Sequence, residues 1–198
     1  MKLVAVTQRV DVYPHRGERR DALDQRVVLW LAGAGYVPVP MPNMSHNGAV
    51  GGLQEWLHTI NPAAVLLTGG NDIGEAPERD ASECHLLDHA EKAGLPVLGI
   101  CRGMQMMGVR AGAECRPVAG HVGIRHQLLG TIPGEANSYH NLALAECPAG
   151  FAVLARSEDG EIEAIRHGKL AWEGWMWHPE RESSFAGRDV DRLRSLFE

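Results

Sequence analysis

The sequence predicts a three-layer α/β fold, in which a mostly parallel central sheet is flanked by helices and continued by antiparallel strands in the second half. Short apolar runs at residues 63–67 (AAVLL) and 96–100 (PVLGI) are typical of strands buried on both faces of a parallel sheet. Helical segments separate these runs, and this alternation favours parallel strands joined by helices. Since the chain has 198 residues, we expect one domain over residues 1–198.

The first half of the chain carries the clearest pattern. Residues 3–7 predict a first strand, and a helix over residues 18–32 is expected to end at Gly33 and Gly35. The apolar positions of that helix are Ala22, Leu23, Val27, Leu29 and Trp30. Further expected elements are an extended segment at 36–40, a polar loop after it, a helix through Leu53, Trp56 and Leu57, strands at 63–67 and 96–100, and helices at 78–92 and from about 103.

The pattern weakens from about residue 114 onward. Residues 151–155 and 162–165 fit short antiparallel strands, residues 171–177 a last strand, and residues 188–197 a last helix.

Three of the predicted strands end in unusual residues. The segment Gly69-Gly70, the thiol of Cys101 and the imidazole of His178 each follow an apolar run. Because an open parallel sheet gathers its active site at the carboxyl ends of its strands, we expect these residues to lie together.

Composition excludes several classes of partner. Acidic residues outnumber basic ones by 25 to 19, the net charge is −6, and no run of Lys or Arg is present, so neither nucleic acid nor an anionic membrane surface is an expected partner. No apolar run is long enough to span a membrane, and the start MKLVAVTQRV does not resemble a signal peptide. We therefore expect a cytoplasmic protein whose four cysteines are thiols, without metal-like spacing.

The stretch VLGICRGMQMMG places Cys101 between Gly99 and Gly103, where a strand gives way to a helix. This spacing has the form of a nucleophile elbow, in which glycines flank a strained turn that exposes the nucleophile. The N-terminus of the following helix favours a thiolate, and the N–H of Arg102 is placed to stabilise an oxyanion. A strand–helix turn holding a buried cysteine would show the same local spacing.

A cysteine nucleophile needs a base, and the segment WMWHPE supplies one after the last apolar strand. His178 would take the thiol proton and later deliver it to the leaving group. Glu180 would hold the imidazole of His178 in the required tautomer.

Four motifs in this order, LLTGGND, GICRG followed by MQ, NSYHN and MWHPE, resemble the class I glutamine amidotransferase family. The resemblance covers nearly the whole chain and implies a flavodoxin-like domain with a Cys–His–Glu triad and no cofactor. It implies that Cys101, His178 and Glu180 are catalytic, and that the N–H groups of Gly70 and Arg102 form the oxyanion hole. The residues implied to line the γ-glutamyl site are Gly69, Gln105, Ser138, Tyr139 and His140.

Further segments, among them TQR at residues 7–9 and WHPERE at 177–182, resemble free-standing γ-glutamyl hydrolases of the family. This resemblance implies a small-molecule substrate, γ-glutamyl-CDP-amidate, cleaved to glutamate and cytidine diphosphoramidate for the phosphoramidate decoration of capsular polysaccharide. A diphosphate favours arginine contacts, and Arg9 is the first candidate because it follows the first strand. Further candidates are Arg19, Arg20, Arg102 and Arg181, with Thr7 and Gln8 within reach of the same pocket.

Other interpretations remain open from the sequence. The chain has no room for a synthetase domain, but a glutaminase working with a separate synthetase subunit, or a hydrolase of γ-glutamyl-4-aminobutyrate, would share the same motifs. A redox or sensor protein with a cysteine elbow would not need His178 and Glu180. Rim or core positions explain His121 and His126 more simply than a metal site, since their spacing does not align them on one helical face.

Overall fold

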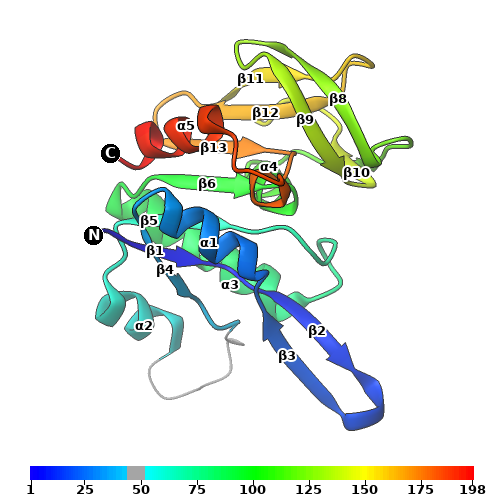
Figure 1. Cartoon of the computed structure of the whole chain (residues 1–198). Helices are drawn as coiled ribbons and strands as arrows, with labels where there is room; N and C mark the ends of the chain where they lie inside the picture. Colours follow the sequence, from blue (N-terminus) through cyan, green and yellow to red (C-terminus); the bar gives the residue numbers. More distant parts are fainter. Residues whose placement is uncertain (44–51) are drawn as a thin grey trace.

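The structure, a computed structural model, describes residues 1–43 and 52–198 (Figure 1). Its main sheet runs in the order β4-β1-β5-β6-β13-β12-β11-β8-β9. The parallel part consists of β4 (Val37–Pro40), β1 (Leu3–Val6), β5 (Ala64–Leu67), β6 (Val97–Ile100) and β13 (Trp172–Trp175). The predicted polar loop after residue 40 falls largely on residues 44–51, which lie outside the described residues.

The predicted parallel strands are confirmed, and their composition explains why. Every residue of β5, β6 and β13 is buried, because helices cover both faces of this part of the sheet. β13 pairs in parallel with β6, with Trp175 opposite Ile100. The segments that follow these two strands, far apart in the sequence, therefore begin side by side at one edge of the sheet.

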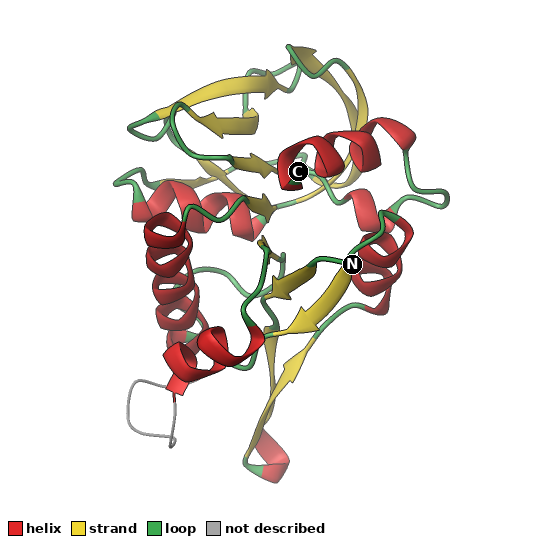
Figure 2. Cartoon of the chain, turned by 90° about the vertical axis from the view of Figure 1, so that its left-hand side faces the viewer, coloured by secondary structure: helices red, strands yellow, loops and turns green. Residues whose placement is uncertain are grey.

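Helices form the two outer layers (Figure 2). The helices α1 (Gln25–Gly33) and α5 (Gly187–Phe197) pack on one face through Trp30 and Leu193, and α2 (Gly52–Ile60), α3 (Pro77–Ala93) and α4 (Arg102–Arg110) pack on the other through Leu57, Leu87 and Met107. The three-layer α/β prediction is thus confirmed. In the part of the chain that the structure describes, no helix combines the length and apolar character that crossing a bilayer requires.

Antiparallel strands continue the sheet beyond β13. The predicted strands near 151 and 162 are confirmed as β11 (Phe151–Arg156) and β12 (Ile162–His167). The sequence did not predict β8 (Val122–Gly130), β9 (Gly134–Tyr139), or the small pair β7 (Cys115–Pro117) and β10 (Leu142–Leu144). Much of β8 is exposed, so its residues lack a regular apolar pattern.

The predicted helix over residues 18–32 is wrong in its first part. Residues Glu18–Ala22 form β3, which pairs antiparallel with β2 (Arg9–Tyr13) around the 3₁₀ turn η1 (Pro14–Arg16), and this hairpin projects from the parallel end of the sheet (Figure 1). The helix begins at Gln25, where the carboxylate of Asp24 accepts a hydrogen bond from the N–H of Arg26 at 2.9 Å. Leu29, expected on the apolar face, is 61% exposed.

Candidate active site

Cys101 lies on a strained turn between β6 and α4. Its φ of 52° and ψ of −108° are rare for a residue with a side chain. A Cβ on Gly99 would lie 2.6 Å from the carbonyl carbon of Gly103, and a Cβ on Gly103 would lie 2.4 Å from the carbonyl oxygen of Leu67. Both glycines are therefore needed for strand, turn and helix to approach this closely.

His178 follows β13, the strand beside the one that ends at Cys101. Its Nδ1 lies 2.7 Å from Oε1 of Glu180, which belongs to the 3₁₀ turn η2 (Pro179–Arg181). A carboxylate accepts hydrogen bonds, so Nδ1 carries the proton and Nε2 is left for the thiol. His178 and Glu180 are 2% and 4% exposed, which keeps their interaction away from bulk water.

The imidazole of His178 has a strongly perturbed pKa. Burial alone would lower this pKa, but hydrogen bonds with Cys101 and Glu180 outweigh burial and raise it from 6.5 to about 9. The ring therefore favours the protonated form at neutral pH, as expected of a group that holds a thiolate and later donates a proton.

Asn137 is a positioning residue that the sequence interpretation did not single out. Its amide donates to the carbonyl of His178 and accepts from the N–H of His178, both at 2.8 Å, so it fixes the backbone of His178 from both sides. It lies in β9 within the NSYHN motif, but nothing in the sequence shows which residue an asparagine amide will reach. The ring of Tyr139, two residues further along the same strand, meets the imidazole of His178 edge-on at 5.7 Å.

A second missed residue, Arg79, orients the loop after β5. Its guanidinium is fully buried and donates to the carbonyls of Thr68 at 2.7 Å and Gly69 at 3.0 Å. The peptide between Gly69 and Gly70 is trans, so the N–H of Gly70 points away from the carbonyl that Arg79 holds. Gly70, with a φ of 94°, lines the same cavity as Cys101.

The side chain of Arg102 is turned to α3. Its guanidinium is buried and forms ion pairs with Glu83 and Asp80, while Glu83 also accepts from Nε of Arg79 at 2.9 Å. Arg102 is the first residue of α4, so its backbone N–H has no partner within the helix. The backbone N–H of Arg102 is therefore available to an oxyanion. Its guanidinium instead joins α4 to α3 through the two ion pairs.

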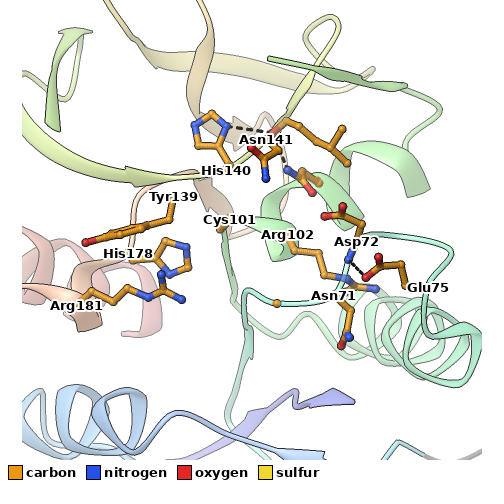
Figure 3. Close-up of a pocket in the computed structure, with 13 residues that line it drawn as sticks. Asn71, Asp72, Glu75, Cys101, Arg102, Tyr139, His140, Asn141, His178 and Arg181 are labelled. Atoms are coloured by element: carbon orange, nitrogen blue, oxygen red, sulfur yellow. Dashed lines mark hydrogen bonds between the residues drawn. The ribbon is translucent and has the colours of Figure 1, made fainter. Parts of the chain in front are cut away.

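A cavity of about 240 Å³ is lined by several of the predicted site residues (Figure 3). Its wall includes Cys101, His178 and Tyr139, whose ring lies against that of His178, as well as Gly70, Gln105 and His140. The other residues that line it are Asn71, Asp72, Glu75, Arg102, Asn141, Leu142 and Arg181. These are mainly polar groups, which suits a substrate with charged ends.

Not every predicted binding residue faces this cavity. Ser138 is fully buried, and its hydroxyl donates to the carbonyl of His121 at 2.7 Å. Gln105 lines the cavity, and its amide nitrogen donates one hydrogen bond to the carbonyl of Leu142 at 2.9 Å, so its amide oxygen and its second N–H are left for a substrate. Gly69 lies against the triad, since a Cβ there would stand 2.8 Å from Cε1 of His178.

Arg9 lines a neighbouring cavity of about 90 Å³ instead. This second cavity is also bordered by Gly69, Gly70, His178 and Arg181. The last three residues line both cavities, so the two cavities meet beside His178 of the triad. The side chain of Arg9 is 53% exposed and pairs with Asp11 at 2.8 Å. The remaining arginine candidates, Arg19 and Arg20, pair with Glu78 and Glu18 and border neither of these two cavities.

Comparisons of sequence and structure identify the family and support the fold. Residues 42–193 match the family model of class I glutamine amidotransferases, and the chain belongs to that family. It is 32% identical over 140 residues to a γ-glutamyl-CDP-amidate hydrolase of Campylobacter jejuni, covering 68% of this chain and 69% of that protein. It is 31% identical over 140 residues to one subunit of the glutamine-hydrolysing GMP synthase of Methanothrix thermoacetophila, covering 65% of this chain and 76% of that subunit.

A solved structure supports the same fold. The crystal structure of a candidate GMP synthase subunit from Thermoplasma acidophilum superimposes with a TM-score of 0.76 at 19% identity, covering 100% of this chain and 94% of that one. Members of this family are cysteine-dependent amidohydrolases, and the relatives named here include both a hydrolase and a synthase subunit.

Proposed function

We propose that this protein is a γ-glutamyl amide hydrolase that uses Cys101, His178 and Glu180 as its triad. The observation that carries the proposal is that the three residues follow two adjacent parallel strands. A strained turn presents the thiol after β6, and a buried imidazole paired with a carboxylate follows β13. A structural cysteine would require neither the strain nor the oriented histidine.

The reaction proceeds through a thioester. Nε2 of His178 accepts the thiol proton, and Sγ of Cys101 adds to the δ-carbonyl carbon of the γ-glutamyl group. The N–H groups of Gly70 and Arg102 stabilise the oxyanion. The C–N bond breaks as His178 protonates the departing nitrogen. Water, deprotonated by His178, then attacks the thioester and releases glutamate and the free thiol.

The two cavities divide the substrate between them. The larger one, with Gln105 and Tyr139 in its wall, would hold the amino and carboxylate ends of the glutamyl group. The smaller one, with Arg9 and Arg181, would hold the leaving group, because guanidinium groups bind diphosphate oxygens through paired hydrogen bonds. This smaller cavity is also bordered by His178, which protonates the leaving nitrogen in this scheme.

The finer proposal is that the substrate is γ-glutamyl-CDP-amidate and the second product cytidine diphosphoramidate, a precursor for the phosphoramidate decoration of capsular polysaccharide. Its support is the pair of arginines beside the triad and the likeness to the Campylobacter jejuni hydrolase. The chief competing function is that of a glutaminase working with a separate synthetase, which the likeness to the Methanothrix thermoacetophila protein supports.

Glutamate release from three substrates separates these functions. The substrates are γ-glutamyl-CDP-amidate, glutamine and γ-glutamyl-4-aminobutyrate, each tested with the wild type and with Cys101→Ala. Cys101-dependent release from the CDP compound with the highest kcat/KM supports the full proposal. Preference for glutamine or for γ-glutamyl-4-aminobutyrate supports the triad and refutes the nucleotide-linked substrate. No release from any of the three refutes the hydrolase and favours a redox or sensor role for Cys101.

A further inference from the structure

A buried cluster of three histidines and one glutamate lies beside the larger cavity and takes no part in the bond-forming and bond-breaking steps described above. His121 precedes β8, His126 lies within β8, His140 follows β9, and Glu163 lies in β12. Their exposed fractions are 2%, 8%, 3% and 0%. The rings of His121 and His140 are 4.7 Å apart, and those of His121 and His126 are 5.1 Å apart.

The outward nitrogens of two of these rings are already occupied. Nδ1 of His140 lies 3.1 Å from the carbonyl oxygen of Leu142, and Nε2 of His121 lies 2.9 Å from Oδ2 of Asp159. Both partners accept hydrogen bonds, so each of these two nitrogens carries a proton. When either ring is neutral, its other nitrogen is a bare lone pair that faces the carboxylate of Glu163.

Lone pairs that face a buried carboxylate repel it unless a positive charge lies between them. Oε1 of Glu163 is 3.3 Å from Nε2 of His140 and 3.5 Å from Nδ1 of His121, and Oε2 is 3.4 Å from Nε2 of His126. These contacts are long and poorly aligned for hydrogen bonds. All five atoms are buried and have no hydrogen-bond partner among the described residues.

The same distances suit ligands that share a metal ion. Zinc bonds of about 2.0–2.1 Å in a tetrahedron place neighbouring ligand atoms about 3.3 Å apart. The ligand atoms of His121, His126 and Glu163 all lie within 4.8 Å of one another, so the widest pair would have to close by up to about 1.5 Å on a common centre. His140 joins this set through Nε2, which lies 3.3 Å from Oε1 of Glu163. Asp159 and the carbonyl of Leu142 would hold two of the rings, as outer partners commonly do for histidine ligands.

We propose that His121, His126, His140 and Glu163 bind one divalent transition-metal ion of the zinc class. Imidazole and carboxylate ligands suit zinc, and four protein ligands leave no open position, which is typical of a structural site. The ion would join β8, β9 and β12. Because the N–H of His140 donates to the carbonyl of His121 at 3.1 Å, it would also fix the end of β9 where Tyr139 and His140 enter the cavity wall.

The site is tested by metal content and by Co²⁺ binding. The full chain is analysed for metal as purified, then treated with a chelator and titrated with Co²⁺, whose visible absorption reports tetrahedral coordination. The titration is also made with Cys101→Ala, because a thiol and an imidazole at the triad could bind the ion instead. His126→Ala and Glu163→Gln remove one proposed ligand each, and His85→Ala on α3 removes an exposed histidine outside the cluster.

We expect one tightly bound ion per chain in the wild type, in Cys101→Ala and in His85→Ala. Removing a ligand should weaken binding by more than about a hundredfold, since losing an outer partner alone costs 10–100-fold. Thermal stability should fall on chelation and return with Zn²⁺. Wild-type protein that neither retains a metal nor shows a saturable Co²⁺ signal would refute the proposal. So would binding that persists in His126→Ala and Glu163→Gln, or that is lost in Cys101→Ala or His85→Ala.

Discussion

Replacing Gly69 by alanine tests whether the position of His178 limits the reaction. The added Cβ would lie 2.8 Å from Cε1 of the imidazole, whereas carbon atoms pack best at about 3.5–4.0 Å. The ring therefore has to retreat by roughly 0.7–1.2 Å. It cannot turn aside freely, because Glu180 holds Nδ1 and Asn137 holds the backbone of His178.

A misplacement of about 1 Å in a catalytic group can cost about a hundredfold in rate. We expect kcat of Gly69→Ala to fall by roughly 10- to 100-fold, a rise in the barrier of about 1.4–2.7 kcal/mol. KM should change little, since the proposed mechanism uses the displaced ring to carry protons and not to bind the substrate. The assay is initial-rate glutamate release from the best wild-type substrate, on protein shown to be folded by circular dichroism.

The matched control is Gly187→Ala at the start of α5, where a Cβ would meet no atom within 4 Å. This control should keep the wild-type kcat. Wild-type kcat in Gly69→Ala, or an equal fall in both variants, would show that the contact between Gly69 and His178 does not govern catalysis.

Three further predictions concern the elbow, the buried ions and the base. Gly103→Ala should destabilise the fold by about 3 kcal/mol, because its Cβ would lie 2.4 Å from the carbonyl oxygen of Leu67; unchanged thermal unfolding would contradict this. Glu83→Gln leaves the guanidinium groups of Arg79 and Arg102 without their shared carboxylate, and should cost about 3–5 kcal/mol in urea unfolding; a cost near zero would contradict it. Because the folded-state pKa of His178 is raised from 6.5 to about 9, its stabilising contribution is complete below pH 6.5 and fades as the pH rises through 9. Cys101→Ala should lower that pKa in an NMR titration, and an unchanged value would remove Cys101 as its cause.

The parallel half of the fold was predictable because burial on both faces leaves a direct mark in the sequence. Strands such as β5 and β6 consist of buried apolar residues or glycine and need no alternation to be recognised. The hairpin β2–β3 leaves no such mark, because the sequence of β3, ERRDA, is charged and largely exposed. β3 is a strand because it pairs with β2. The helical pattern of the residues after it hid the point at which the strand ends and α1 begins.

The triad could be placed together from topology, since strand ends of a parallel sheet converge. The residues that position the triad could not be predicted from the sequence. Asn137 and Arg79 act through the carbonyls of His178 and Gly69, and a backbone carbonyl has no signature in a sequence. The pairing of Arg102 with Glu83 and Asp80 depends on how α4 packs on α3, which local pattern does not determine.

The position of β13 in the sheet has a consequence for the order of events during synthesis. This strand is inserted between β6 and β12, and it is followed closely by His178. During synthesis, Cys101 therefore leaves the ribosome well before His178, the base of the proposed mechanism, has been added to the chain. In the proposed mechanism, Cys101 gains its base only when the sheet closes around β13, so a partly made chain lacks the activated thiol. Full reactivity of Cys101 then reports that the sheet is complete.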